Sequence, residues 1–484
     1  MTPETPHRPR ILCVGAYERD NFGDLLFQMV SDRYFTGMDV VYAAPFASDM
    51  SELTGHHVPA FGPLLTTETF DAVWTVGGEV GGTTNEYAYM TAFGWPAVRA
   101  LEASPADQRR AQLAELQGPI PVESPYLPRA SAYPGSLGAA TVLNSVGLSR
   151  IAELAPIRKA GLLGILREAT RISVRDRLSS AFLESEDIAH TLDPDLVHAL
   201  AVSRPRPDLV RGDYVLVQVS EPHLKKVSVE AFAQALIDGP VFRDNPVRLF
   251  LAGTAPGHDS VEAYQRIVEL VLAADPERRI TISQMRDPWD RVDEIAAAKL
   301  WVGGSLHGRI VACAYGVPRV SIAKRKLDEY AQTWDDAMPW GVEPPTMAEA
   351  AETALAVTGD DRGETLGRQA HDNMTAAVAH VRAWADFGAP AGRAEELFQL
   401  RNRQWDRLMI EEGRADDLRQ EQQRRREREE AERAERAQAE RERAAQVRAE
   451  RDRLAAREAR RPSRRARRWV RRTVSRMRRP GRPS

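Results

Sequence analysis

Cysteine is scarce in this chain of 484 residues, where only Cys13 and Cys313 occur. Two cysteines so far apart form no disulfide framework, and no CxxC pair is present to bind a metal ion. Both lie in apolar segments that we expect to be buried, one in a strand and one in a helix. The cysteine content therefore indicates a reducing compartment, and no other group of side chains suggests a metal site or a resident cofactor.

Long apolar runs are also missing from the sequence. A helix needs about twenty consecutive apolar residues to span a membrane, and no such run occurs. The first ten residues, MTPETPHRPR, precede only a short apolar strand, so no signal peptide is predicted. We expect a cytoplasmic protein, either soluble or bound peripherally at the inner face of the cell membrane.

The nucleotide-binding motifs GxGxxG and GKS/T are absent as well, so neither a dinucleotide site nor a Walker-type site is supported. The N-terminal region does contain a strand, Ile11–Tyr17, followed by a turn at Asn21 and Gly23 and then an apolar helix. This order is typical of an α/β domain. Asp24 fits either the cap of that helix or a catalytic carboxylate, and Asn21 is a candidate substrate contact in the same turn.

Strands and helices alternate along most of the chain, and a Pro-rich stretch, Ser203–Asp208, separates two such series. Alternation at short spacing implies parallel sheets, so we expect two Rossmann-like domains that face each other across a cleft. The predicted boundaries are 1–205 for the first domain, 206–345 for the second and 346–394 for helices that close the core. The expected strands are Ile11–Tyr17, Asp39–Ala44, Ala72–Gly78, Thr141–Gly147, Arg171–Asp176, Tyr214–Ser220, Arg248–Gly253, Ile280–Ser283, Lys299–Val302 and Arg319–Ala323.

A glycine-rich loop, GGEVGGTTNEYAY, runs from Gly77 to Tyr89. Four glycines within six residues allow a ligand to approach the backbone closely, which makes Gly78 a candidate substrate contact. A plain glycine loop without a ligand is the alternative. From Phe93 to Pro134 the composition is irregular and rich in proline, which predicts a variable insertion near the cleft with acceptor binding as a candidate role.

The segment Gly303–Pro318, GGSLHGRIVACAYGVP, places a polar turn between a strand and an apolar helix expected to begin at Ile310. Turns at the carboxyl ends of parallel strands are where open α/β sheets bind ligands, and their N–H groups can hold an anion. His307 is the candidate acid or base because imidazole titrates near neutrality. A purely structural histidine is the alternative.

Arg175 stands at the end of another expected strand. A guanidinium binds phosphate or carboxylate through two N–H groups, so Arg175 is a candidate anion ligand. A pair with an aspartate in its own turn is the alternative.

Five short motifs occur along the chain in order: NFGD at Asn21–Asp24, SVRD at Ser173–Asp176, LDPDL at Leu192–Leu196, SLHG at Ser305–Gly308 and YGVP at Tyr315–Pro318. Together, between Ile11 and Trp334, they resemble the polysaccharide pyruvyl transferase family. The resemblance implies a two-domain fold similar to that of the B-type glycosyltransferases. It also implies transfer of a pyruvyl group from phosphoenolpyruvate to two hydroxyls of a sugar, giving a cyclic ketal on a cell-surface polysaccharide or a lipid-linked glycan. By motif match, His307 corresponds to the key histidine of the family and Arg175 to the arginine of its SVRD motif.

The chain departs from the family two residues before the histidine. Many members carry an arginine there, and this sequence has Ser305. Arg309 and Arg325 are the candidates to replace the missing charge, and with Ser305 and Gly308 they complete the expected substrate-binding set.

The chemistry of this transfer explains why such residues are needed. Phosphoenolpyruvate carries a phosphate and a carboxylate, which Arg175, Arg309 and the glycine turns can bind. Protonation of the vinyl carbon creates an oxocarbenium-like centre, and His307 suits that proton transfer while Asp24 is the candidate base for the sugar hydroxyl. The reaction requires no metal ion. Two other classes stay open: a nucleotide-sugar-dependent glycosyltransferase, and a non-catalytic glycan-binding or scaffold protein.

One long helix is predicted over 395–460. After Gln420 the sequence consists almost wholly of Glu, Arg, Gln and Ala, which favour helices, and each Glu–Arg pair at i,i+4 adds about 0.3 kcal/mol. A coiled coil needs an apolar seam, and here the seam is mostly Ala, with Val447 and Leu454. A free-standing charged helix and a weak coiled coil that joins copies of the chain both fit.

The net charge of −3 conceals a basic C-terminus. Eleven arginines and no acidic residue lie within Arg461–Ser484, so the rest of the chain carries −3 − 11 = −14. Ala466, Val470, Val474 and Met477 recur at helical spacing, which predicts a basic amphipathic helix suited to an anionic membrane surface. Nucleic acid is the second candidate partner of this tail, and a solvated tail without a partner is the third.

Overall fold

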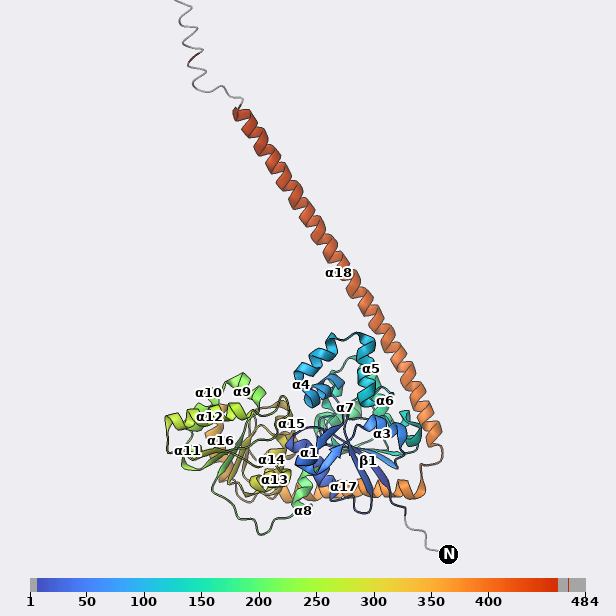
Figure 1. The fold of residues 1–484 in the computed structure, drawn as a ribbon, viewed down its shortest axis with the longest axis vertical. Helices are drawn as coiled ribbons and strands as arrows, with labels where there is room; N and C mark the ends of the chain where they lie inside the picture. Colours follow the sequence, from blue (N-terminus) through green and yellow to red (C-terminus); the bar gives the residue numbers. More distant parts are fainter. Residues whose placement is uncertain (1–6, 460–468, 470–484) are drawn as a thin grey trace, which may run out of the picture. The chain divides into compact units, whose positions relative to one another are not determined.

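The computed structural model describes residues 7–459 and residue 469. The chain divides into two units, Met1–Leu408 and Met409–Ser484. The first unit contains two parallel β-sheets with helices packed around them, and a long helix runs from its end into the second unit (Figure 1). The expected α/β class with a long C-terminal helix is confirmed.

The first half of the first unit is built on a six-stranded parallel sheet in the order β2-β1-β5-β6-β7-β8. All residues of its central strands β5 and β6 are buried, as expected of parallel strands covered on both faces. The strands are β1 (Arg10–Val14), β2 (Asp39–Ala43), β5 (Ala72–Val76), β6 (Ala140–Val146), β7 (Arg171–Val174) and β8 (Thr191–Leu192). The helices are α1 (Phe22–Asp32), α2 (Ser51–Thr54), α3 (Phe61–Thr67), α4 (Asn85–Ala103), α5 (Ala106–Gln117), α6 (Pro156–Glu168), α7 (Arg177–Ser185) and α8 (Leu200–Ser203), and β3 (Ser48–Met50) forms a separate hairpin with β4 (His56–Val58).

The second half contains a five-stranded parallel sheet in the order β11-β10-β9-β12-β13. Its strands are β9 (Val215–Gln218), β10 (Val247–Leu249), β11 (Ile280–Ile282), β12 (Leu300–Gly303) and β13 (Arg319–Ser321). Its helices are α9 (Glu221–Val227), α10 (Val229–Asp238), α11 (Pro240–Asp244), α12 (Val261–Ala274), α13 (Pro288–Ala297), α14 (Leu306–Ala314) and α15 (Arg325–Trp334), followed by α16 (Met347–Ala356) and α17 (Arg362–Phe387).

The stretch expected to be an irregular insertion is partly helical. Helix α4 begins before Phe93, and α5 comes soon after it in the same stretch. The residues that suggested irregular structure stand at helix boundaries: Gly94 breaks α4 with a φ of 81°, Pro96 restarts the helix behind it, and Pro105 precedes α5. Proline is well tolerated at the start of a helix because its missing N–H has no partner there anyway.

The two halves share apolar contacts and are fastened to each other. The ring of Phe250 meets Phe22 of the first half edge-on, with centroids 5.6 Å apart, and meets Trp301 of its own half at 5.3 Å. Asp20 of the first half forms a salt bridge of 3.0 Å with Arg291 of the second. Asn373 of α17 donates to Asn144 at 2.9 Å, so this helix returns from the second half to the first sheet.

Helix α18 spans Arg393–Ala459. Its first turns, up to Leu408, belong to the first unit and pack within it: Leu397 is buried, and the Gln404 side chain covers Gly164 so closely that a Cβ there would lie 2.2 Å from it. No helix within 7–459 is long and apolar enough to cross a membrane. The predicted basic amphipathic helix lies outside the described residues, apart from Trp469.

Candidate active site

The candidate site lies at the carboxyl ends of β7 and β12, which lead into Arg175 and Ser305. Ser305 caps α14, because its side-chain oxygen accepts a hydrogen bond from the Gly308 amide at 3.3 Å. The helix therefore begins at Leu306, earlier than the expected Ile310. His307 belongs to the first helical turn and not to a loop.

His307 is buried, with 7% of its surface exposed. Its Nε2 lies 3.6 Å from Oδ2 of Asp195, and its ring meets the ring of Phe27 edge-on with centroids 4.8 Å apart. Gly23 of the NFGD motif leaves room for the imidazole, since a Cβ at that position would lie 1.7 Å from Nδ1. Gly23 and Phe27 both belong to α1, so the first half surrounds a histidine that the second half supplies.

Arg175 is only 3% exposed and donates from Nη1 to Oδ2 of Asp195 at 2.8 Å. Its partner is therefore not the aspartate of its own turn: Asp176 instead caps α7 by accepting from the Ser179 amide at 2.7 Å. The Arg175 guanidinium and the His307 imidazole, one from each half, thus meet at the same carboxylate oxygen.

Asp195 was not singled out from the sequence, although it stands in the LDPDL motif. Its side chain is fully buried, and its Oδ1 accepts from the Val197 amide at 3.0 Å. Burial acts to raise the pKa of this carboxyl, but His307 and Arg175 outweigh burial and hold the pKa well below its usual range. Asp195 is therefore an anion that fixes the two candidate residues relative to each other.

Asp24 and Asn21 lie beside this pair, at the start of α1. Asn21 caps the helix, since its Oδ1 accepts from the Gly23 amide at 3.2 Å. The capping role considered for Asp24 is wrong, because Asp24 is the third residue of the helix. Its Oδ2 instead accepts from Asn21 Nδ2 at 2.7 Å and from Arg19 Nη2 at 2.9 Å. Arg19, which no sequence pattern marked, orients the candidate base.

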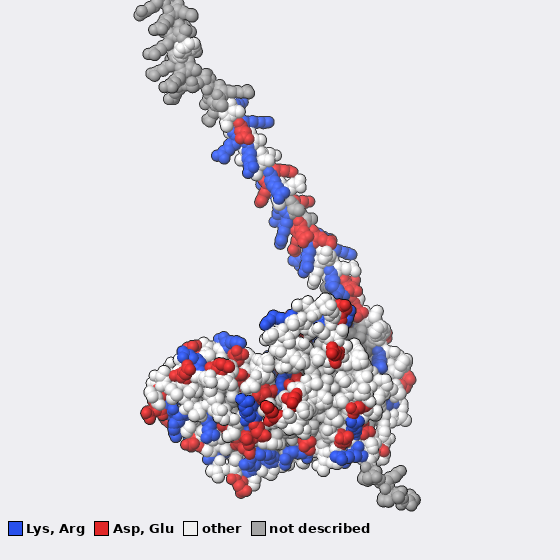
Figure 2. Space-filling model, in the orientation of Figure 1, with Lys and Arg blue, Asp and Glu red and all other residues white. Residues whose placement is uncertain are grey.

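Two lysines after β13 were also missed. Lys326 is an exposed residue, but its ammonium end lies against the protein, and desolvation lowers its pKa to about 8, with a further lowering by Lys324 and Arg175. Asp24 and Glu79 oppose this effect, so Lys326 belongs to the same charged cluster as Arg175 and Asp24. Figure 2 shows basic and acidic residues side by side where the two halves adjoin. The sequence signal was the run of basic residues, KRK, just past the end of a strand.

Arg325, the middle residue of that run, is not brought to the site. It pairs with Glu153 at 2.9 Å and with Glu329 at 2.8 Å, and 63% of its side chain is exposed. The structure therefore gives no support to its expected substrate contact.

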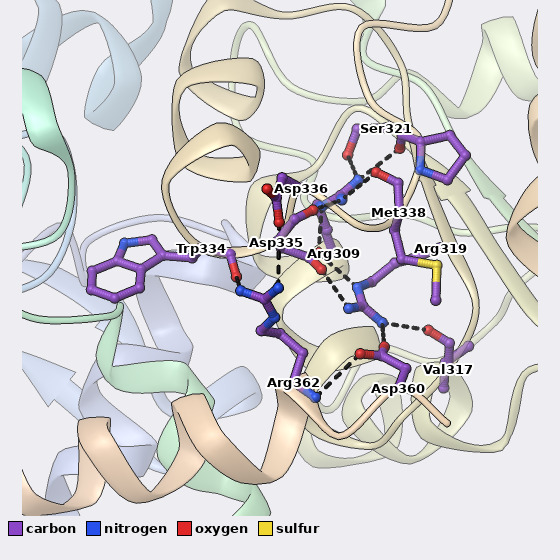
Figure 3. Close-up of polar contacts among 11 residues, drawn as sticks. Arg309, Val317, Arg319, Ser321, Trp334, Asp335, Asp336, Met338, Asp360 and Arg362 are labelled. Atoms are coloured by element: carbon purple, nitrogen blue, oxygen red, sulfur yellow. Dashed lines mark hydrogen bonds and ion pairs between the residues drawn. The ribbon is translucent and has the colours of Figure 1, made fainter. Parts of the chain in front are cut away.

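Arg309 is likewise engaged elsewhere, which contradicts its expected contact with the donor. Its guanidinium is buried and donates to Asp335, to Ser321 and to backbone carbonyls of the chain that follows α15 (Figure 3). Arg319 binds the same Asp335 carboxylate, so the cluster ties α14 to β13 and α15. Gly308 also has a packing role, because a Cβ there would lie 2.0 Å from the Trp301 ring.

The glycine-rich loop contributes a turn and a carboxyl group. Gly78 has a φ of 77°, and its carbonyl accepts from the Gly147 amide at 2.7 Å, so the expected contact residue also fastens the loop to the end of β6. Burial raises the pKa of Glu79 although Arg175 acts in the opposite direction. Within 7–459, no group of three or more His, Cys, Asp or Glu side chains is placed to hold a metal ion.

Comparison with known families agrees with the motifs. The model of the polysaccharide pyruvyl transferase family matches residues 137–324. The expected resemblance is confirmed, over a shorter stretch than Ile11–Trp334. The pyruvyl transferase stretch contains Arg175, Asp195 and His307, and because the family is one of transferases, the match supports an enzyme that modifies a polysaccharide.

No curated protein matches the chain. Solved structures that resemble it include UDP-N-acetylglucosamine 2-epimerase from Rickettsia bellii, with a TM-score of 0.47 and 11% identity over 78% of this chain and 98% of that one. The UDP-GlcNAc 2-epimerase from Methanocaldococcus jannaschii has a TM-score of 0.44 and 12% identity over 75% and 99%. Sucrose-phosphate synthase from Thermosynechococcus elongatus has a TM-score of 0.37 and 14% identity over 82% and 100%. The fold described above rests on the chain's own sheets.

Proposed function

We propose that this protein transfers a pyruvyl group from phosphoenolpyruvate to two hydroxyls of a sugar, forming a ketal on a cell-surface polysaccharide or a lipid-linked glycan. The observation that carries the proposal is the convergence of Arg175 and His307 on Asp195. All three residues lie within the stretch that matches the transferase family.

The proposed reaction balances without any cofactor. Carbon 3 of phosphoenolpyruvate takes up one proton and becomes a methyl group, while carbon 2 forms bonds to two sugar oxygens. The bond between carbon 2 and the phosphate oxygen breaks. One hydroxyl proton accounts for the methyl group and the other leaves with the phosphate, so no oxidant or reductant is needed.

The residues of the site suit the separate tasks of this reaction. The charge of Arg175 and Lys326 attracts the phosphate and carboxylate of the donor. His307 delivers the proton to carbon 3. Asp195 holds the imidazole of His307 and the guanidinium of Arg175 in fixed positions. Asp24, oriented by Arg19, accepts the proton of the attacking hydroxyl.

The C-terminal region gives this proposal a location. We assign the basic stretch 461–484 to an anionic membrane surface, which would keep the enzyme in the cytoplasm close to lipid-linked glycans. The preceding helix is then either a spacer or a contact between copies of the chain.

The test is phosphate release from phosphoenolpyruvate in the presence of candidate glycans, measured for the full chain and for His307→Ala. Loss of the acid–base group is expected to lower turnover by roughly 10²- to 10⁴-fold. His57→Ala is the matched control, because His57 is an exposed histidine on β4. Undiminished turnover in His307→Ala would remove His307 from the mechanism, and turnover of a UDP-sugar in place of phosphoenolpyruvate would indicate a glycosyltransferase.

A further inference from the structure

The first half carries its exposed aromatic residues on one helix. Within residues 7–205, the aromatic side chains more than a third exposed are Tyr87, Phe93 and Trp95, at 48%, 41% and 54%. All three belong to α4 and lie within nine residues of one another. A soluble surface seldom gathers large apolar side chains in this way unless it binds something.

Helix α4 is joined directly to the candidate site. Thr91, one turn after Tyr87, accepts a hydrogen bond from Arg19 Nη1 at 2.7 Å. The other end of the same guanidinium donates to Asp24 at 2.9 Å. Burial acts to lower the pKa of the Arg19 guanidinium, and Tyr87 is among the nearby groups that raise it. Helix α4 is therefore joined through the buried Thr91 to the arginine that holds the candidate base.

Phe93 is held in place by contacts with neighbouring aromatic rings. The ring of Phe93 lies 5.3 Å from that of the buried Phe46 and 4.7 Å from that of Tyr89. Gly94 then breaks the helix, so Trp95 begins a second segment with a changed direction. Tyr87 and Trp95 are left as the two side chains with about half of their surface free.

The surroundings of these side chains favour a sugar over other occupants. Tyr and Trp offer a flat apolar face and a polar edge, which matches a sugar ring with its C–H face and its hydroxyl rim. An anionic membrane would require clustered positive charge, and α4 and α5 together carry four acidic residues and three arginines. A second copy of the chain would need about 800 Å² of surface on each partner, whereas these three side chains, each about half exposed, offer roughly 200–400 Å² in all.

We propose that Tyr87 and Trp95 form the acceptor subsite, stacking on a sugar ring of the glycan and directing its hydroxyls towards Asp24. This inference rests on the proposed function, because it names where the acceptor of that reaction binds. It assigns α4 to acceptor recognition and leaves the donor to Arg175 and Lys326.

Saturation-transfer NMR on the full chain tests this assignment, with lactose, cellobiose and N,N′-diacetylchitobiose as probes. We expect transfer to the C–H protons of at least one disaccharide, and its loss in the double variant Tyr87→Ala/Trp95→Ala. Phe387→Ala is the control, because Phe387 is an 87% exposed aromatic at the end of α17. The conservative variant Tyr87→Phe/Trp95→Phe should retain the contact, which separates stacking from a folding defect.

Kinetics with an active glycan give a second readout. The double alanine variant is expected to raise KM for the glycan roughly tenfold, as loss of two stacking contacts implies, with KM for phosphoenolpyruvate unchanged.

Three results would overturn the subsite. The first is that no sugar shows saturation transfer, and the second is that saturation transfer survives in the double alanine variant. The third is that the double variant loses binding to vesicles while its contact with sugars is unchanged. If the double alanine variant still contacts sugars and His307→Ala is inactive, the proposed transferase function is supported and the subsite is not. If the wild type contacts sugars through Tyr87 and Trp95 but releases no phosphate from phosphoenolpyruvate, the subsite is supported and the transferase function is not.

Discussion

At the scale of single residues, position in the sequence identified some of the chemistry and burial decided the rest. His307 and Arg175 could be selected because each follows a predicted strand, where parallel sheets bind ligands. Their common partner Asp195 could not be selected from the sequence. Its role depends on contacts with one residue from each half, and these contacts exist only in the folded protein. Arg309 was selected wrongly. It lies two residues after His307 in the sequence, but its guanidinium is buried against Asp335.

Lys326 gives a pH dependence that can be measured. Desolvation lowers its pKa to about 8. The ammonium loses its proton as pH rises through that value, and its attraction for a phosphate is lost with it. We therefore expect KM for phosphoenolpyruvate to rise between about pH 7 and about pH 9, and Lys326→Ala to raise KM roughly tenfold or more at neutral pH.

Two variants control this measurement by steady-state kinetics. Lys326→Arg retains its charge throughout and should flatten the rise in KM. Lys226→Ala removes an exposed lysine that pairs with Glu343 and should change nothing. A KM that stays constant from neutral to alkaline pH in the wild type would contradict a role for Lys326 in donor binding.

At the scale of helices and strands, the sequence was informative where apolar runs alternate with turns. Most expected strands agree with the structure within a few residues, as Ala72–Gly78 does with β5. Helix α14 begins at Leu306 and not at the expected Ile310, because Ser305 caps it. The pattern of apolar residues alone does not contain this signal. Helices α4 and α5 were missed because Gly94 and Pro96 resemble loop residues until the break between two helical segments is seen.

The start of α1 illustrates how one element shapes the site of another. A Cβ at Gly23 would lie 1.7 Å from Nδ1 of His307, so Gly23→Ala must push the imidazole away. Alanine gains about 1 kcal/mol over glycine in a helix, but displacing a buried ring costs about 1–3 kcal/mol, so we expect the unfolding free energy to fall by about 0–2 kcal/mol. Turnover should fall about 10²-fold, as a misplaced catalytic group implies. Gly138→Ala, where the added carbon meets nothing within 4 Å, is the control for phosphate-release assays. Equal activity in the two variants would show that the position of His307 is unimportant.

At the scale of the whole molecule, the chain combines a compact unit with a charged helix. The described candidate-site residues fall within Met1–Leu408, and the helix continues through the second unit to Ala459. The sequence could not decide between a free helix and a coiled coil, because the composition suits both. The structure shows ion pairs along the helix itself, such as Arg425 with Glu429 at 3.0 Å and Arg436 with Glu432 at 3.6 Å.

These pairs make the free helix testable. Each contributes only about 0.3–0.5 kcal/mol and is screened by salt. The far-ultraviolet circular dichroism of a chain ending at Ala459 minus that of a chain ending at Leu408 reports residues 409–459 of this helix. We expect this difference to decrease from about 0.01 M to about 1 M salt, as the Debye length falls from about 30 Å to about 3 Å. Association between copies of the chain is the second point to test.

The difference spectrum should be independent of protein concentration, and sedimentation should show a monomer. The reason is that large apolar side chains on the helix, such as Val447 and Leu454, are too sparse to form the seam of a coiled coil. A difference spectrum that grows with concentration and persists in salt would instead establish a coiled coil between copies of the chain.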